Sequence, residues 1–331
     1  MDVRADQFAS YKLLASEFEK RGYSMTESVE NDTLYVSFTS PTGKVWRTAA
    51  AKIGYPFNSR RVRDYSRNKE TAHIFVDEHG MSSPGTYYLH HTDNVDVAID
   101  TMLGKYQKLI VKPSDSSLSK GLSVNLTTKD AVQQAVSVAR EVSSSVLIQE
   151  QVVGEEIRFV ALQGKIVAAL LRQTPQVVGD GVSTVAHLIS LENEARKTLK
   201  FPFITYPLLD DLLIPSELIE SDLVLQKGEV LELSGATMIK SGCSIYNILD
   251  QIDATYVKQV ERIAIELAAG FIVIDVFVRD YSTPLTQDNY WFIEFNTAPV
   301  LKLFYGCRDG NMFDIVPLLA QAIDHHLHND R

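Results

Sequence analysis

The chain has 331 residues, of which 45% are apolar and 22% charged, and its formal net charge is −10. This length and composition are typical of a globular protein with two domains, or with one domain and an inserted lobe. The negative charge argues against nucleic acid as the main partner, because phosphate binding favours a basic surface. A local basic pocket for a small anion remains compatible with it.

Two cysteines, Cys243 and Cys307, are too few for a disulfide framework and favour a reducing compartment. No apolar run reaches the roughly 18 residues that a transmembrane helix requires. The first residues carry early acidic side chains and no apolar signal core. We therefore expect a cytoplasmic protein that has no membrane partner.

The first 65 residues predict a small α/β domain. Apolar residues recur at three- and four-residue spacings over 1–22, as on one face of a helix that ends at Gly22. Thr33–Thr39 alternates like a strand, and Val45–Ala51 is its predicted hairpin partner across the turn at Pro41–Gly43.

The rest of the chain alternates helical and strand patterns. Further helices are predicted at 66–79, 128–142, 185–199, 255–269 and 313–327. Further strands are predicted at 86–89, 109–112, 146–149, 157–162, 165–172, 223–225, 230–233, 271–278 and 290–295. Glycine turns at 163–164 and 227–228 join two pairs of these strands into hairpins. This order favours an α+β fold with mixed or antiparallel sheets and helices on one face, over a doubly wound parallel sheet.

Common nucleotide, zinc and hydrolase motifs are absent from the sequence. It has no P-loop, no dinucleotide-binding glycine fingerprint, no zinc-type Cys/His spacing and no nucleophile elbow. A cluster of His325, His326 and His328 falls at the end of the last predicted helix. Solvated side chains near the negative end of the helix dipole explain this cluster, and a metal site is the alternative.

A lysine at a strand end precedes a run of small residues, from Lys112 to Ser123. Small side chains let backbone N–H groups approach phosphate oxygens, and Lys120 adds positive charge. These residues predict a phosphate-binding loop, and a surface loop with incidental lysines is the alternative.

Two carboxylates and an amide fall on the two most apolar strands. Glu294 and Asn296 are two residues apart, so both point to one face of their strand, and Asp275 lies on the preceding strand. Hard oxygen ligands of this kind suit Mg²⁺ with a bound phosphate. The alternative is a buried acid that is paired with an arginine such as Arg279, because an unpaired buried carboxylate is costly.

Two weaker patterns complete the candidate site. The strand at 146–149 runs into a short connector that can offer backbone groups to an adenine edge, with acidic residues nearby for ribose hydroxyls. Arg172 ends a strand before the tight turn at Gly179–Thr184. It faces either a bound anion or solvent at the exit of a hairpin.

These features occur in the order found in the ATP-grasp superfamily, and the chain resembles most the carboxylate–amine ligase modules of cyanophycin synthetases and bifunctional glutathione synthetases. The resemblance covers about residues 66–310. It rests on four segments: Asn68–Thr71 with Gly80–Pro84, Val178–Ile189, Asn193–Arg196, and Ile274–Asp275 with Phe292–Pro299.

The resemblance implies two α+β lobes that grip ATP between them, with a small N-terminal α/β domain. The implied domains are an N-terminal domain at 1–65, a central lobe at 66–150 that carries the small phosphate loop, and a C-terminal lobe at 151–331 that carries the magnesium and substrate site.

The resemblance also assigns roles to single residues. The implied ATP contacts are Lys69, Lys112, Ser114, Lys120, Gly121, Gln149, Glu150, Val152 and Glu156. One or two Mg²⁺ ions, with Mn²⁺ as an alternative, would bind Asp275, Glu294 and Asn296. The implied catalytic residues are Arg172, Lys240 and Arg158. Lys240 either binds a substrate carboxylate or is solvated.

The implied reaction joins an amino acid or short peptide to an amine. ATP would phosphorylate a carboxylate, the amine would displace phosphate from the acyl phosphate, and ADP and phosphate would be released. A homodimer is a possible assembly. Two alternatives stay open: an ATP-binding regulator of the same fold without turnover, and a kinase-like phosphoryl transfer to a carboxylate. Relatives often have glycine where Val300 stands, so the amine acceptor is not defined by the resemblance.

Overall fold

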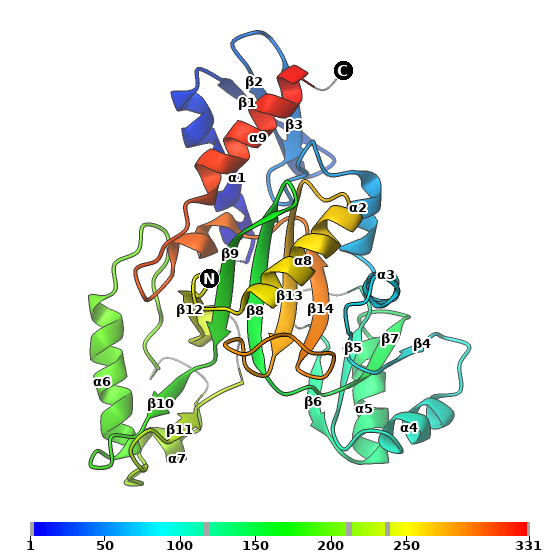
Figure 1. Ribbon diagram of the computed structural model, residues 1–331, viewed down its shortest axis with the longest axis vertical. Coiled ribbons are helices and arrows are strands. Elements are labelled where there is room, and N and C mark those ends of the chain that lie inside the picture. The colour runs from blue at the N-terminus through cyan, green and yellow to red at the C-terminus, as the bar shows by residue number, and fades with distance from the viewer. Residues whose placement is uncertain (1–2, 116–119, 210–213, 236–238, 330–331) are drawn as a thin grey trace.

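The computed structural model describes residues 3–115, 120–209, 214–235 and 239–329, without the side chains of residues 3–9 and of Lys240. Four units are visible in Figure 1: a cap at the top, a central sheet, and two smaller units below it on either side. Within the described residues, no helix is long and apolar enough to cross a membrane.

The cap combines the two ends of the chain. It contains α1 (Val3–Lys20), the antiparallel strands β1 (Ser24–Glu30), β2 (Thr33–Thr39) and β3 (Val45–Ala49), and α9 (Ile315–Asn329). The predicted first helix and hairpin are confirmed, and β1 is an additional strand. Helix α9 packs against α1, although the two lie at opposite ends of the sequence (Figure 1).

The central sheet has five antiparallel strands in the order β12-β9-β8-β13-β14. These are β8 (Glu155–Leu162), β9 (Lys165–Gln173), β12 (Ser244–Asn247), β13 (Phe271–Val278) and β14 (Tyr290–Asn296). The predicted hairpin of β8 and β9 across Gln163 and Gly164 is confirmed, and β13 and β14 pair as neighbours. Every strand pair is antiparallel, as the hairpin-rich sequence favours.

Each face of the central sheet is covered differently. One face packs against α8 (Ala254–Glu266) and α3 (Lys69–Glu78). Helix α3 follows the short helix α2 (Arg60–Tyr65), and the side chain of Asn68 caps its N-terminus. The other face is apolar only at one end, where the cap and the 3₁₀ helix η3 (Leu301–Tyr305) bury it. Helices α9 and α8 therefore lie on opposite faces.

The unit at the lower right of Figure 1 is a second antiparallel sheet, in the order β4-β7-β5-β6. Its strands are β4 (Thr86–Leu89), β5 (Leu109–Pro113), β6 (Ser123–Leu126) and β7 (Val146–Glu150). Its core is closed by α4 (Val95–Leu103) and α5 (Lys129–Arg140). The side chain of Thr128 caps α5 by accepting from the Ala131 N–H.

The unit at the lower left corrects one prediction. The segments at 223–225 and 230–233 do not pair with each other. Instead β11 (Val230–Glu232) pairs with β10 (Gln176–Val178), and Val224 forms a single bridge to Thr184. Helices α6 (Val185–Thr198) and α7 (Ser216–Ile219) complete the unit.

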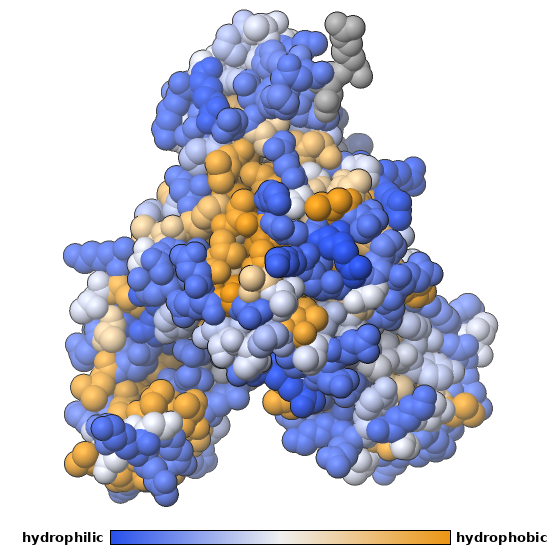
Figure 2. Space-filling model, viewed as in Figure 1, coloured by the Kyte–Doolittle hydropathy of each residue, from blue (hydrophilic) through white to orange (hydrophobic). Residues whose placement is uncertain are grey.

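This lower-left unit has a small core and an apolar surface. Figure 2 shows apolar residues gathered over it. Exposed apolar side chains of this part of the chain include Val178, Val182, Leu191, Leu223, Val224 and Val230. Since the unit is small, it cannot cover all of its apolar side chains by itself.

Asn58 ties the chain that leaves the cap to the start of β13. It is buried, its amide donates to the carbonyl oxygen of Phe271 at 2.6 Å, and its oxygen accepts from the N–H groups of Gly270 and Phe271, both at 2.9 Å. Three backbone groups at the start of β13 therefore depend on one side chain.

We expect Asn58→Ala to lower the free energy of unfolding by about 2–4 kcal/mol, because it leaves these buried backbone groups without partners. Asn311→Ala is the matched control, since Asn311 is exposed and its side chain bonds only to Asp309. Urea denaturation of both variants measures the difference. Equal destabilisation by the two substitutions would contradict this role of Asn58.

Candidate active site

Charged residues line the end of the central sheet that the cap leaves uncovered. Strand alternation places Glu156 and Arg158 of β8 on one face, and register sets Glu156 opposite Arg172 and Arg158 opposite Asp275. Glu294 lies opposite Asp275 on the next strand. Four segments that are distant in the sequence thus bring these predicted residues together.

Three ion pairs connect this charged face. Arg172 Nη1 lies 2.6 Å from Glu156 Oε1. Arg158 binds both oxygens of Asp275, with Nε at 2.7 Å from Oδ1 and Nη2 at 2.6 Å from Oδ2. Lys69 Nζ, at the start of α3, lies 3.5 Å from Glu294 Oε2. Each carboxylate that was predicted to hold ribose or metal therefore has a cation beside it.

Asp275 is a buried acid paired with an arginine, which is the alternative to a metal ligand that the sequence left open. The aspartate is only 2% exposed and is paired with an arginine, but the partner is Arg158 and not Arg279, which lies 5.2 Å from the ring centre of Trp291. Burial opposes the charge of Arg158, and Asp275 more than offsets this, so that the pKa of Arg158 is raised. Arg158 is therefore charged at neutral pH.

Lys112 of β5 reaches this face from the second sheet. Burial, together with the positive charge of Lys69, lowers the pKa of Lys112 to about 8, while Glu294 acts in the opposite direction. The two sheets therefore meet where Lys112, Lys69 and Glu294 lie close together. A phosphate group placed there would find two ammonium groups.

A β-bulge turns Glu294 toward the charged face. Asp275 pairs with Glu294 and Val276 with Phe292, which leaves Ile293 as the extra residue of β14. His73 of α3 occupies this point, with Nε2 3.2 Å from the Ile293 carbonyl oxygen and Nδ1 2.9 Å from the Tyr88 hydroxyl. Since the carbonyl must accept, the Tyr88 hydroxyl donates to Nδ1 of a neutral imidazole.

Some of the predicted adenine contacts already form hydrogen bonds within the protein, and others do not. Gln149 is 1% exposed and donates to Thr86 Oγ1 at 2.7 Å. The backbone N–H of Glu150 donates to Gly85, and that of the next residue donates to Lys108. Within the described residues, the N–H of Val152 has no hydrogen-bond partner, so it is the first N–H after β7 that can donate to a ligand.

The predicted phosphate loop lies only partly in the described chain. Residues 116–119 and the side chain of Lys240 lie outside it. Ser114 is buried and its N–H donates to Ser145. Gly121 has φ +75°, and a Cβ there would lie 2.9 Å from Pro113, so the end of the loop requires glycine. Lys120 adjoins it in the chain.

The donor set of Asp275, Glu294 and Asn296 fits a hard divalent cation. Two carboxylates and an amide stand on adjacent strands and face the same way, and Asn296 lies opposite Val273 in this register. No group of three His, Cys, Asp or Glu residues in the described chain is placed to hold a metal ion. A site here depends on the amide of Asn296, which accepts from the Ala298 N–H at 3.0 Å.

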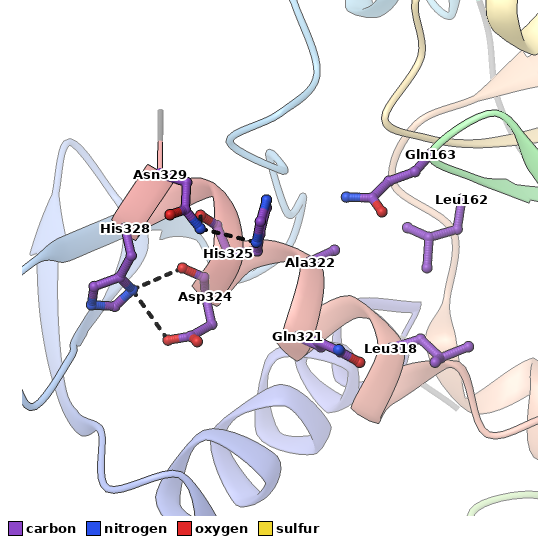
Figure 3. Close-up of a pocket in the computed structure, with 9 residues that line it drawn as sticks. All are labelled: Leu162, Gln163, Leu318, Gln321, Ala322, Asp324, His325, His328 and Asn329. Carbon is purple, nitrogen blue, oxygen red and sulfur yellow. Dashed lines mark hydrogen bonds and ion pairs between the residues drawn. The ribbon is translucent and has the colours of Figure 1, made fainter. Parts of the chain in front are cut away.

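The histidine cluster lies elsewhere, beside a hollow of about 500 Å³ between α9 and the β8–β9 turn (Figure 3). His328 turns to its own helix, with Nδ1 2.8 Å from the Asp324 carbonyl oxygen and Nε2 2.7 Å from Thr42. His325 is hydrogen-bonded to Asn329. The histidines therefore bond within α9 and to the β2–β3 turn. Within the described residues, they form no metal site.

The chain is similar to known ligases in sequence. It is 25% identical over 226 residues to the glutathione biosynthesis bifunctional protein GshAB of Streptococcus agalactiae, which covers 65% of this chain and 30% of that protein. It is 25% identical over 281 residues to the cyanophycin synthetase of Geminocystis herdmanii, a match that covers 79% of this chain and 32% of that protein. The chain thus spans about a third of the length of these relatives. No family model matches it.

The fold comparison covers more of the chain. The crystal structure of a bifunctional glutathione synthetase from Pasteurella multocida superposes with a TM-score of 0.64, covering 97% of this chain and 44% of that one, at 18% identity. The chain has an ATP-grasp ligase fold. The resemblance seen in its sequence motifs is confirmed at the level of sequence similarity and of fold.

Sequence reasoning missed two features of this site. His73 lies in a predicted helix, but nothing local indicates that it faces a bulge 220 residues away. Glu192 binds both Arg196, at 2.8 Å, and Arg308, and Arg308 also donates to Ser244 at 3.0 Å. The helical spacing of Glu192 and Arg196 could have indicated an ion pair, whereas Arg308 comes from a distant segment.

His73 makes the folded chain sensitive to acid. Burial and the nearby Lys112 lower the pKa of His73 to about 3, below its ordinary value of 6.5. Because the unfolded chain binds this proton more readily, the folded state loses stability as pH falls from about 6.5 toward 3, by on the order of 5 kcal/mol in total.

We expect His73→Gln, which can still donate to Ile293 and accept from Tyr88, to flatten the dependence of unfolding free energy on pH in this window. Chemical denaturation at several pH values between 7 and 4 measures it. His187→Gln, at an exposed position of α6, is the control and should retain the wild-type slope. An unchanged slope in His73→Gln would show that other groups cause the acid sensitivity.

Proposed function

We propose that the protein is an ATP-dependent carboxylate–amine ligase that joins an amino acid or short peptide to an amine. The observation that carries this proposal is the convergence of four cations and three carboxylates on one uncovered sheet face. The cations are Lys69, Lys112, Arg158 and Arg172, and the carboxylates are Glu156, Asp275 and Glu294. The similarity to ligases in sequence and fold supports the same reaction class.

The chemistry requires activation of a carboxylate, because oxide is a poor leaving group. In the proposed reaction a substrate carboxylate oxygen attacks the γ-phosphorus of ATP, and ADP leaves. The amine nitrogen then attacks the acyl carbon, phosphate leaves, and the amine loses a proton. Mg²⁺ held by Asp275, Glu294 and Asn296 would neutralise charge on the transferring phosphoryl group.

The chain's own cations supply the remaining electrostatic stabilisation. Lys69 and Lys112 lie where the two sheets meet, so they can hold the β- and γ-phosphates. Arg172 lies two strands from Asp275 on the same face and can bind the substrate carboxylate as it is phosphorylated. Val152 offers its free N–H to the adenine edge, and Glu156 can accept ribose hydroxyls once Arg172 has moved to the substrate.

A pairwise substrate screen tests the proposed function. Phosphate release is measured with ATP and Mg²⁺ against the twenty amino acids, singly and in pairs, followed by mass spectrometry. A ligase gives a signal that needs both substrates, and a product mass equal to their sum minus water. A phosphorylated product without the amine would support kinase-like transfer instead. Bound ATP with no turnover on any pair would contradict a ligase of amino acids.

Glu294→Gln tests the metal set. We expect turnover to fall at least about 100-fold, because the amide removes a charged ligand from the phosphoryl-transfer site, while the melting temperature changes little since Glu294 is partly exposed. Glu194→Gln is the matched control, since Glu194 pairs with Lys197 at the surface of α6 and should retain full turnover. Full activity of Glu294→Gln would contradict the metal assignment.

Lys112 predicts a pH dependence of nucleotide binding. Its pKa of about 8 in the free protein rises when a phosphate lies beside it, so ATP binding takes up a proton above about pH 8. Affinity is then constant below pH 8 and falls above it, by up to about tenfold per pH unit. Calorimetry at pH 8.5 in two buffers of different protonation enthalpy measures the proton uptake.

Lys112→Met should abolish this proton uptake, because the titrating group is gone. Lys108→Met, at an exposed position immediately before β5, should retain it. Proton uptake that persists in Lys112→Met would assign the effect to another group.

A further inference from the structure

We propose that Arg158 is an internal counter-ion that a divalent cation must displace from Asp275, so that cation and nucleotide bind strongly only together. This inference rests on the proposed function, because it concerns the same metal and nucleotide site. It adds a positioning role for Arg158 and a coupling between the two ligands, neither of which follows from the fold.

The geometry of the pair shows the competition. Arg158 engages both oxygens of Asp275, at 2.7 and 2.6 Å, side by side along the carboxylate. The side chains are 11% and 3% exposed, so water screens the pair little. A metal ion that approached this carboxylate would meet a fixed positive charge at close range, in surroundings where such repulsion is strong.

The charge count of the site favours neither ligand alone. Four cations face three carboxylates, so the face carries one excess positive charge at pH 7. A divalent cation alone would raise this excess to three. ATP alone would bring four negative charges against one, next to Asp275 and Glu294. The cation and ATP together bring a net of two negative charges, which changes the charge of the face from one positive to one negative.

An exchange of partners satisfies every group. Phosphate oxygens accept two parallel hydrogen bonds from a guanidinium, as the carboxylate of Asp275 does. Arg158 can therefore pass from Asp275 to a phosphate while Asp275 passes to the cation. Lys69 and Glu294 can separate in the same way, since their 3.5 Å contact is longer and partly exposed. The pairing seen in the structure keeps the charges of Asp275 and Glu294 partnered until both ligands arrive.

The test measures Mn²⁺ binding directly, without turnover. Free Mn²⁺ is followed by electron paramagnetic resonance, with and without the non-hydrolysable analogue AMP-PNP. In the wild type we expect the analogue to tighten Mn²⁺ binding at least about tenfold, and Mn²⁺ to tighten binding of the analogue by the same factor, as linkage requires.

Arg158→Gln should tighten Mn²⁺ binding in the absence of nucleotide at least about tenfold and reduce the coupling to near unity. Arg279→Gln is the matched control, because it removes the same charge from the end of β13 but does not touch Asp275. It should behave as the wild type. Arg158→Lys keeps one charge but cannot span both carboxylate oxygens, so it should give an intermediate Mn²⁺ affinity and serves if the glutamine variant does not fold.

Two failures can be told apart. If Mn²⁺ and AMP-PNP bind the wild type together, but Arg158→Gln and Arg158→Lys leave the Mn²⁺ affinity without nucleotide unchanged or weaker, the counter-ion role is overturned and the proposed ligase stands. If the wild type binds no AMP-PNP even with Mn²⁺, the proposed function itself fails. Absence of Mn²⁺ binding in the wild type and in every variant would overturn both.

Discussion

An ionised carboxylate in the middle of an apolar strand requires a cation beside it, and this requirement organises the centre of the molecule. Asp275 interrupts the buried run of β13, where its neighbours in the strand are all apolar. The antiparallel register sets Arg158 of β8 directly opposite. Without that arginine the carboxylate would be protonated or the strand would be destabilised. The pairing of β8 with β13 is thus the contact on which the charged face depends.

The central sheet uses one face for two purposes. Toward the cap, the positions that continue this face are apolar, including Val160, Leu170 and Val273, and the cap buries them. Toward the other end, the same alternation presents charged residues. A period of two residues fixes which side chains share a face, and the change from apolar to charged along each strand fixes where the cap must end.

Helix α3 connects the two sheets and positions both. Ala72, Phe75 and Val76 pack into the core of the central sheet. Lys69 and His73, on another side of the same helix, contact β14, and His73 also reaches Tyr88 of the second sheet. Because His73 is buried and neutral, it can bind a carbonyl oxygen and a hydroxyl group at once. The bulge that directs Glu294 therefore depends on a residue of α3.

Local sequence patterns predicted much of this fold because they are strong where strands are buried. The hairpin of β8 and β9, the strands β2 and β13, and the helix capped by Thr128 all have such patterns. Strand β1 does not: Ser24–Glu30 is exposed along its whole length and shows no apolar alternation. The pairing of β10 with β11 was missed because its partners are about 50 residues apart.

Some residues of the candidate site could likewise be predicted from local sequence patterns, and others could not. Asp275, Glu294 and Asn296 could be chosen because carboxylates on apolar strands are conspicuous in a sequence. The partner of Asp275 could not be predicted from the sequence, because Arg158 and Arg279 are equally plausible until the strand register is known. Gln149 was chosen for its place at a strand end, but its side chain is committed to Thr86 inside the sheet.

The pairing of Arg172 with Glu156 extends the same principle to the substrate. In the proposed ligase, a substrate carboxylate that binds Arg172 must take the place of Glu156, whose oxygen lies 2.6 Å away. Glu156 is then released toward the ribose of the nucleotide. Lys69, Arg158 and Arg172 are each held by a carboxylate that another ligand needs. Such a site favours complete occupancy, because a ligand that binds alone leaves one member of a pair buried without a partner.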